Sequence, residues 1–151
     1  SVLALSRQNL PQLRVEAAPE NLVARGAYRL RRAAAPRRVV FLATGSEVAI
    51  ACDAAAALEA EGIGCDVVSM PCWERFDAQP ADYRAGLLPG DALIVSVEAG
   101  VTLGWERYTG SAGLRFGVDS FGASAPIDAL YAHFGLTAAA IAEKVGAALA
   151  R

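Results

Sequence analysis

Histidine, lysine and cysteine are scarce in this 151-residue chain, and their scarcity excludes several kinds of site. The only histidine is His133, so a histidine-based zinc site has no second imidazole. Cys52, Cys65 and Cys72 contain no C-x-x-C pair, so neither a zinc motif nor a disulfide framework is indicated. We therefore predict no metal-binding residue in the chain, and unpaired thiols suit a reducing, cytoplasmic compartment.

Long apolar runs and a strong net charge are also missing. The apolar stretches have the length of strands rather than of membrane spans, and no segment resembles a signal peptide. A formal net charge of -2 creates no field that would gather nucleic acid. We interpret the local basic cluster of Arg31, Arg32, Arg37 and Arg38 as a solvated loop and strand edge. Neither nucleic acid nor a membrane is predicted as a partner.

Motifs for nucleotide binding and acyl transfer are absent as well. No G-x-G-x-x-G occurs, the sole lysine is Lys144, and no G-x-S-x-G accompanies the lone histidine. The glycine turn at residues 44–47 precedes a predicted helix and offers N–H groups to a phosphate, but Glu47 would repel it. We favour a capping box, in which Thr44 and Glu47 each satisfy a backbone N–H of the first helical turn.

The chain does have a rich apolar content, 54 % of its residues, with a mean hydropathy of +0.32, so we predict one domain with a sizeable core. Apolar patterning predicts strands at residues 27–32, 39–43, 65–70, 92–97 and 114–118. It predicts helices at residues 47–61, 127–134 and 138–150, the last capped by Thr137, and shorter helical stretches within 73–88 and 101–108.

Strands that alternate with helices predict a mainly parallel sheet with helices on both faces, which is a three-layer α/β/α fold. The strand at residues 27–32 is joined to the strand at 39–43 by a short turn. We predict that it is an antiparallel edge strand, because a turn of a few residues cannot make a parallel crossover.

Two polar side chains follow predicted strands directly. Arg7 comes after an apolar stretch at residues 2–6, where its guanidinium can grip a phosphate or carboxylate through two N–H groups; an inter-strand salt bridge is an equally good interpretation. Glu98 follows the strand at 92–97, at the carboxyl end where ligands of open α/β sheets gather. We favour a structural role for Glu98, as acceptor of hydrogen bonds from the loop at 99–101, and a surface position for His133.

The amino terminus indicates a piece of a longer polypeptide. Ser1 is followed at once by an apolar run, with no initiator methionine and no polar lead-in. Residues 8–19 contain Pro11 and Pro19 and are predicted to be an irregular linker.

Several short blocks, in order along the whole chain, resemble the C-terminal domain of transketolases. The block L-S-R-Q-N-L-P at residues 5–11 is similar to the segment that joins their pyrimidine-binding domain to the C-terminal domain. The other blocks are A-R-G-A-Y at 24–28, L-A-T-G-S-E-V at 42–48, V-V-S-M-P at 67–71, V-E-A-G at 97–100 and S-F-G-A-S-A-P at 120–126. The resemblance implies a five-stranded sheet with one antiparallel strand, the end of the preceding domain plus a linker at residues 1–20, and the C-terminal domain at 21–151.

The resemblance also implies a function and a site. It assigns Arg7, the arginine of S-R-Q-N-L, to the phosphate of a sugar substrate. The intact enzyme would be a homodimer that moves a two-carbon ketol unit from a ketose phosphate to an aldose phosphate in the pentose phosphate pathway, using thiamine diphosphate and Mg²⁺. The family's catalytic, cofactor-binding and metal-binding motifs lie upstream of Ser1, so the chain alone is expected to be inactive.

Two other functions stay open at this point. A dihydroxyacetone synthase shares the same blocks. A stand-alone ligand-binding or regulatory module would use the strand ends near Thr44 and Glu98.

Overall fold

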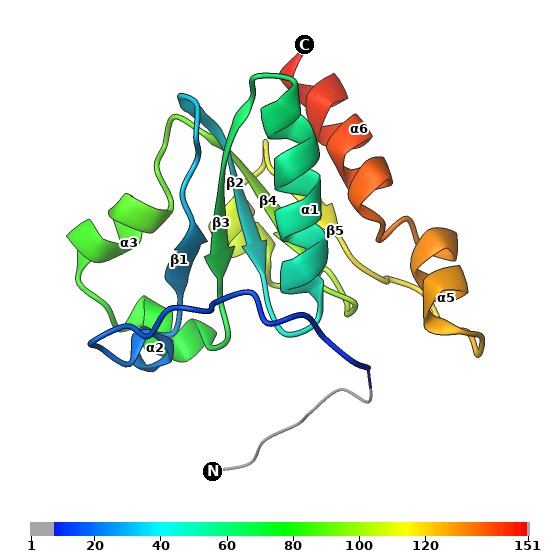
Figure 1. The fold of residues 1–151 in the computed structure, drawn as a ribbon, viewed down its shortest axis with the longest axis horizontal. Helices are drawn as coiled ribbons and strands as arrows, with labels where there is room; N and C mark the ends of the chain where they lie inside the picture. Colours follow the sequence, from blue (N-terminus) through cyan, green and yellow to red (C-terminus); the bar gives the residue numbers. More distant parts are fainter. Residues whose placement is uncertain (1–7, 151) are drawn as a thin grey trace.

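The computed structural model describes residues 8–150, which form one five-stranded sheet with helices packed on both of its faces (Figure 1). The strands lie in the order β1-β3-β2-β4-β5, with β1 antiparallel to β3 and every other neighbouring pair parallel. The predicted three-layer α/β fold is confirmed. The strands are β1 (Tyr28–Arg31), β2 (Arg37–Ala43), β3 (Gly64–Ser69), β4 (Leu93–Val97) and β5 (Leu114–Phe116). The helices are η1 (Leu22–Arg25, a 3-10 turn), α1 (Glu47–Ala60), α2 (Trp73–Asp77), α3 (Ala81–Leu87), α4 (Glu106–Thr109), α5 (Ile127–His133) and α6 (Ala138–Leu149).

The central strand β2 contributes side chains to two separate hydrophobic cores, because successive side chains of a strand point to opposite faces of the sheet. Val39 and Phe41 pack with residues of α1 and α6, whereas Val40 and Leu42 pack with residues of α2 and α3. All four side chains are fully buried. The continuous apolar run that predicted this strand therefore reflects burial on both faces.

The antiparallel strand β1 has a different partner from the one predicted. It lies at the edge of the sheet, as expected, but it pairs with β3, with Tyr28 opposite Ser69, and not with β2. The short connection from β1 to β2 crosses the start of β3. Gly64 makes this crossing possible, because a Cβ there would overlap the carbonyl oxygens of Ala35 and Pro36.

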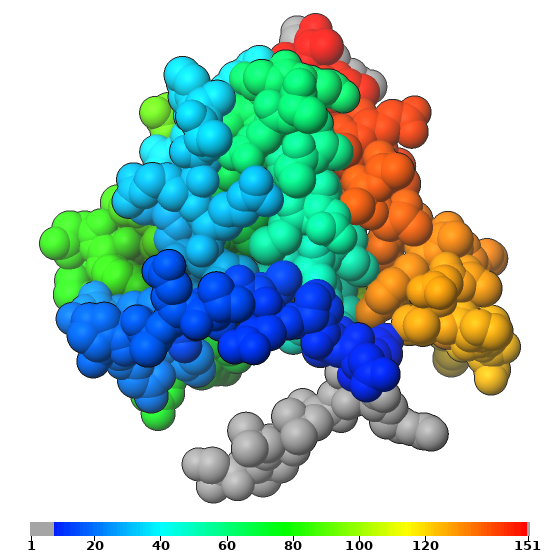
Figure 2. Space-filling model, viewed as in Figure 1, coloured from blue at the N-terminus to red at the C-terminus, as the bar shows by residue number. Residues whose placement is uncertain are grey.

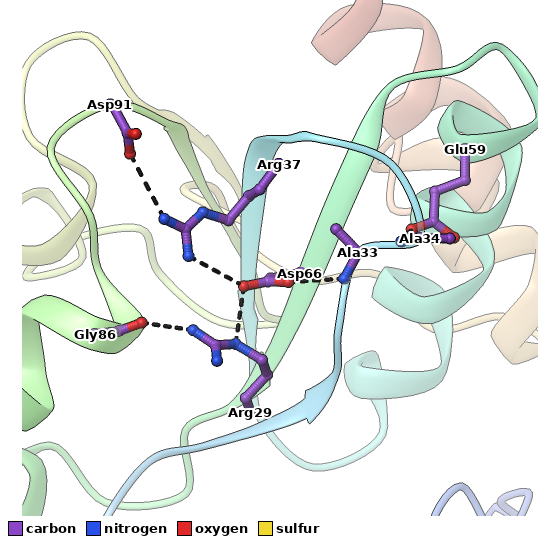
Figure 3. Close-up of polar contacts among 8 residues, drawn as sticks. All are labelled: Arg29, Ala33, Ala34, Arg37, Glu59, Asp66, Gly86 and Asp91. Carbon is purple, nitrogen blue, oxygen red and sulfur yellow. Dashed lines mark hydrogen bonds and ion pairs between the residues drawn. The ribbon is translucent and has the colours of Figure 1, made fainter.

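A buried carboxylate at Asp66 of β3 holds this crossing in place (Figure 3). Arg29 Nε lies 2.8 Å from Asp66 Oδ2, without the alignment of a hydrogen bond, and Arg37 Nη1 lies 3.4 Å from the same oxygen. The backbone N–H of Ala33 donates to Asp66 Oδ1 over 2.8 Å. Asp66 therefore ties β1, the connection and β2 to β3, far from the ends of the strands where ligands gather.

The basic cluster of the sequence also contacts groups within the domain. Arg31 Nη2 lies 3.0 Å from Glu59 Oε2 on α1, and Arg38 donates to the Leu149 carbonyl over 3.4 Å. These arginines stand at the end of β1 and the start of β2, which agrees with the interpretation as loop and strand edge.

Most predicted helices are confirmed. α1 is followed by Gly62 with a φ of 81°, and the Thr137 hydroxyl accepts the Ala140 N–H at the start of α6. The linker at residues 8–19 contains neither helix nor strand, as predicted. The helical stretch predicted at 101–108 is shorter and later, because helix α4 spans only Glu106–Thr109. The strand predicted at residues 2–6 lies outside the described residues. Within residues 8–150, no helix has the length and hydrophobicity needed to cross a membrane.

Candidate functional site

The carboxyl ends of the four parallel strands lie at one edge of the sheet, toward the bottom of Figure 1. The loops that leave them, and the linker that crosses below them, form the candidate site. Open α/β sheets bind ligands at this edge, because the loops diverge there and helices begin there. A hollow lined by Leu13, Arg14, Gly45, Val48 and Ser69 lies between the linker and the ends of β2 and β3.

The start of α1 carries a buried carboxylate that two hydroxyl groups satisfy. Glu47 is only 5 % exposed, and its Oε1 accepts hydrogen bonds from Ser46 Oγ over 2.7 Å and from Tyr131 Oη over 2.6 Å. Burial and the hydrogen bond to Glu47 raise the pKa of Tyr131, so its hydroxyl stays protonated and donates at neutral pH. This arrangement fastens α5 to the start of α1.

The predicted capping box at Thr44 and Glu47 is wrong. The helix begins later than that motif requires, because Ser46 precedes it in a helical conformation and makes no side-chain cap. Thr44 contributes only its carbonyl, which accepts the Glu47 N–H over 3.3 Å. Glu47 is the first residue of the helix, whereas a capping box needs it in the third position, and its side chain contacts Tyr131 instead.

Glu98 has a structural role, as predicted, but its hydrogen-bond donor is different. Its Oε2 accepts the indole N–H of Trp105 over 2.7 Å, not the N–H groups of the loop at 99–101. The Trp105 side chain is almost fully buried, and its ring meets that of Trp73 edge to face at a centroid distance of 4.9 Å. Glu98 therefore positions an aromatic cluster beneath the edge.

The loop after β4 and the segment after β5 are bonded to each other. Asp119 accepts the backbone N–H of Thr102 over 2.7 Å and its hydroxyl over 2.8 Å, and the Val118 N–H donates to the Gly100 carbonyl over 2.8 Å. A Cβ on Gly117 would overlap the Gly100 carbonyl oxygen, so the two backbones touch. We call these contacts the Thr102–Asp119 clamp, and nothing local in the sequence predicted it.

The clamp predicts how the loops respond to acid. The two hydrogen bonds from Thr102, its backbone N–H first, lower the pKa of Asp119 from its ordinary 3.8. A carboxyl whose folded pKa is depressed stabilises the fold above its unfolded pKa, and this contribution disappears as the pH falls through the folded pKa. We expect the Thr102 amide proton to titrate by NMR with a midpoint below 3.8.

Two variants control this titration. Thr102→Val removes the hydroxyl but keeps the backbone N–H, so the midpoint should rise only part of the way. Asp119→Asn should abolish the titration at Thr102. A midpoint at or above the ordinary aspartate value would contradict the clamp.

The remaining predicted residues lie apart from one another. His133 is exposed at the end of α5, as predicted, with its ring against that of Phe134. Arg7 lies outside the described residues. Its neighbour Gln8 is half-buried. Hydrogen bonding from the Gln8 side chain to the Tyr131 hydroxyl lowers the pKa of Tyr131 and so opposes its net rise. The described chain therefore begins beside the Glu47 and Tyr131 pair, where the dark-blue linker meets the orange segment around α5 in Figure 2.

No acid–base pair or metal cluster is assembled at this edge by residues 8–150. Glu47 and Glu98 are engaged by hydroxyl and indole donors, and no group of three or more His, Cys, Asp or Glu side chains in this range has an arrangement that could hold a metal ion.

The chain is similar to one protein family in both sequence and fold. Residues 26–137 match the model of the transketolase-like TK C-terminal domain. The transketolase of Rhodobacter capsulatus is 50 % identical over 151 residues, which cover 96 % of this chain and 22 % of that protein. The transketolase of Sinorhizobium medicae is 55 % identical over 139 residues, covering 91 % of this chain and 20 % of that protein. A solved transketolase from Pichia stipitis, in complex with sedoheptulose 7-phosphate, has a TM-score of 0.83 and 37 % identity, over 95 % of this chain and 20 % of that one. The chain thus spans about a fifth of the length of these relatives.

Proposed function

We propose, from the premise that this chain belongs to the family of transketolase-like C-terminal domains, that it serves as the C-terminal domain of a transketolase. In this role it supplies a surface for assembly with the other domains and a second subunit, and one ligand for the substrate phosphate. The observation that carries the proposal is the family match over residues 26–137, together with identities of 50 % and 55 % to two transketolases.

The proposed reaction of the complete enzyme is transfer of a two-carbon ketol unit between a ketose phosphate and an aldose phosphate. Thiamine diphosphate, held with Mg²⁺, supplies the chemistry when bound, as an electron sink. The described residues of this chain do not fit that cofactor, because the carboxylates of Glu47 and Glu98 at this edge already have donors and no metal cluster is formed within residues 8–150. We therefore assign the cofactor to the other four fifths of a transketolase, and expect this chain alone to be inactive.

Arg7 is the residue of this chain that we assign to the substrate phosphate. Support comes from its place in S-R-Q-N-L and from its neighbour Gln8, which lies at the carboxyl edge of the sheet. A guanidinium binds a phosphate through two parallel N–H groups. The cytoplasm is the proposed compartment, since Cys52, Cys65 and Cys72 are free thiols.

The Arg7 assignment is tested in a chimaera in which this chain replaces the matching segment of the Rhodobacter capsulatus transketolase. Arg7→Ala should raise KM for a phosphorylated ketose roughly tenfold and leave kcat nearly unchanged, because a remote phosphate is bound alike in the ground and transition states. With a non-phosphorylated ketose, KM should not change. Steady-state kinetics on both substrates measure the difference.

The matched control is Arg32→Ala, which removes the same charge at an exposed position just after β1, at the opposite edge of the sheet. It should leave both KM values as they are. An Arg7→Ala variant with unaltered kinetics on the phosphorylated ketose would remove Arg7 from the site. An unmodified chimaera that folds but transfers nothing would refute the proposed function itself.

A further inference from the structure

Exposed apolar side chains gather at the carboxyl edge of the sheet. Six of the eight large hydrophobic residues that are exposed within residues 8–150 belong to segments there: Leu10, Leu13, Val101, Leu103, Phe121 and Ile127. Phe121 is 100 % exposed, Leu103 76 % and Val101 58 %. Single exposed apolar residues are common on proteins, but a cluster on one edge indicates a contact surface.

Three of these side chains lie on loops that are hydrogen-bonded to each other. Val101 and Leu103 flank Thr102, and Phe121 follows Asp119 by two residues, so all three stand beside the Thr102–Asp119 clamp. The clamp uses the polar groups of both loops internally and leaves the apolar side chains facing outward. A surface held in place before binding loses less conformational entropy when a partner covers it.

An apolar hollow adjoins these loops. It has a volume of about 200 Å³ and is lined mainly by apolar side chains of α5 and its flanking segments. The lining includes Val118, Ile127, Leu130, Tyr131, Phe134 and Leu136. An engineered cavity of about 150 Å³ takes up benzene, so this hollow has room for one aromatic or branched side chain. We call the hollow and the side chains of Val101, Leu103 and Phe121 the apolar edge surface.

We propose that the apolar edge surface docks on the domain that precedes the C-terminal domain in transketolases, an inference that rests on the proposed function. Two observations select this occupant over a second copy of the chain. About four fifths of each relative lies outside the matched stretch, and the matched family model is that of a C-terminal domain. The described chain also enters the domain at Gln8, beside Tyr131, which lines the hollow. A domain that is joined to the chain before Gln8 is therefore expected to lie next to this surface.

The test uses the same chimaera and compares it with the 151-residue chain alone by hydrogen exchange. The backbone amides of Leu103 and Phe121 should exchange at least tenfold more slowly in the chimaera, because the preceding domain covers them. Phe121→Asp should restore fast exchange in the chimaera, since docking would bury an unpaired charge. In the isolated chain the same substitution should leave the urea midpoint unchanged, because Phe121 makes no buried contact there.

The matched control is Ala112→Asp, which adds the same charge at an exposed alanine before β5, at the opposite edge of the sheet. It should keep the slow exchange. Equal exchange in the chimaera and the isolated chain would overturn the docking surface. Exchange in the isolated chain that slows as the protein concentration rises would assign the surface to contact with a second copy. This result would also overturn docking on the preceding domain. An active chimaera with fast-exchanging loops refutes only the surface, whereas an inactive chimaera with slow-exchanging loops refutes only the proposed function.

Discussion

Asp66→Ala is expected to destabilise the domain by about 3 kcal/mol, the low end of the range for removing one partner of a buried ion pair. Asp66 is 2 % exposed, and without it the guanidinium groups of Arg29 and Arg37 lose their shared carboxylate while the Ala33 N–H loses its acceptor. The low end applies because the arginine side chains are 19 % and 29 % exposed, so water compensates part of the loss. Urea unfolding at neutral pH measures the change in the free energy of unfolding.

Asp91→Ala is the matched control. Asp91 also faces Arg37, at 3.6 Å, but its side chain is 81 % exposed. Removing an exposed partner of this kind changes the free energy of unfolding by less than about 1 kcal/mol. Equal effects of the two substitutions would show that burial of Asp66 contributes nothing, and would contradict the role assigned to it in the crossing from β1 to β2.

The Asp66 cluster also explains which part of the sheet could be predicted from sequence. Apolar runs and glycine turns were enough to predict the strands, most of the helices and the antiparallel direction of β1. They could not give its partner, because the choice between β2 and β3 depends on Gly64 and Asp66, which lie some thirty residues further along the chain. A charged residue inside a buried strand was the one available signal, since such a residue requires partners from elsewhere.

The candidate site shows the same limit. Glu47 and Glu98 were correctly expected to have structural roles, but each was given donors from its own loop. The donors to Glu47 are the hydroxyls of its neighbour Ser46 and of Tyr131, which is 84 residues away, and the donor to Glu98 is Trp105, seven residues away. Local patterns predict local hydrogen bonds, whereas burial at a sheet edge brings together side chains that are distant in sequence. The Thr102–Asp119 clamp and the exposure of Phe121 were missed for this reason.

The assignment of Arg7 depends on resemblance rather than on spacing. From the residues alone, a phosphate ligand and a salt bridge were equally good interpretations, and the structure describes the chain only from Gln8 onward. The matched family model begins at residue 26 and does not include Arg7, so the role of this arginine depends on the kinetic test on the chimaera.

Gly26→Ala is expected to destabilise the domain by at least about 3 kcal/mol, from a left-handed backbone and an overpacked contact together. Gly26 has a φ of 83°, and a Cβ there would overlap the backbone of α2 at Phe76 and the carbonyl of Cys72. Its own carbonyl accepts the Cys72 N–H over 3.0 Å, so the strain would also separate the start of β1 from α2. Urea or thermal unfolding measures the loss.

Gly62→Ala separates the two causes. Gly62 has nearly the same φ, 81°, but no atom lies within 4 Å of an added Cβ. Its substitution should therefore cost only the conformational part, about 1 to 2 kcal/mol. The difference between the two variants measures how tightly α2 packs against the turn into β1. If both substitutions cost the same, the approach of α2 to Gly26 is looser than the structure indicates, and the glycine of A-R-G-A-Y is required for its backbone angle alone.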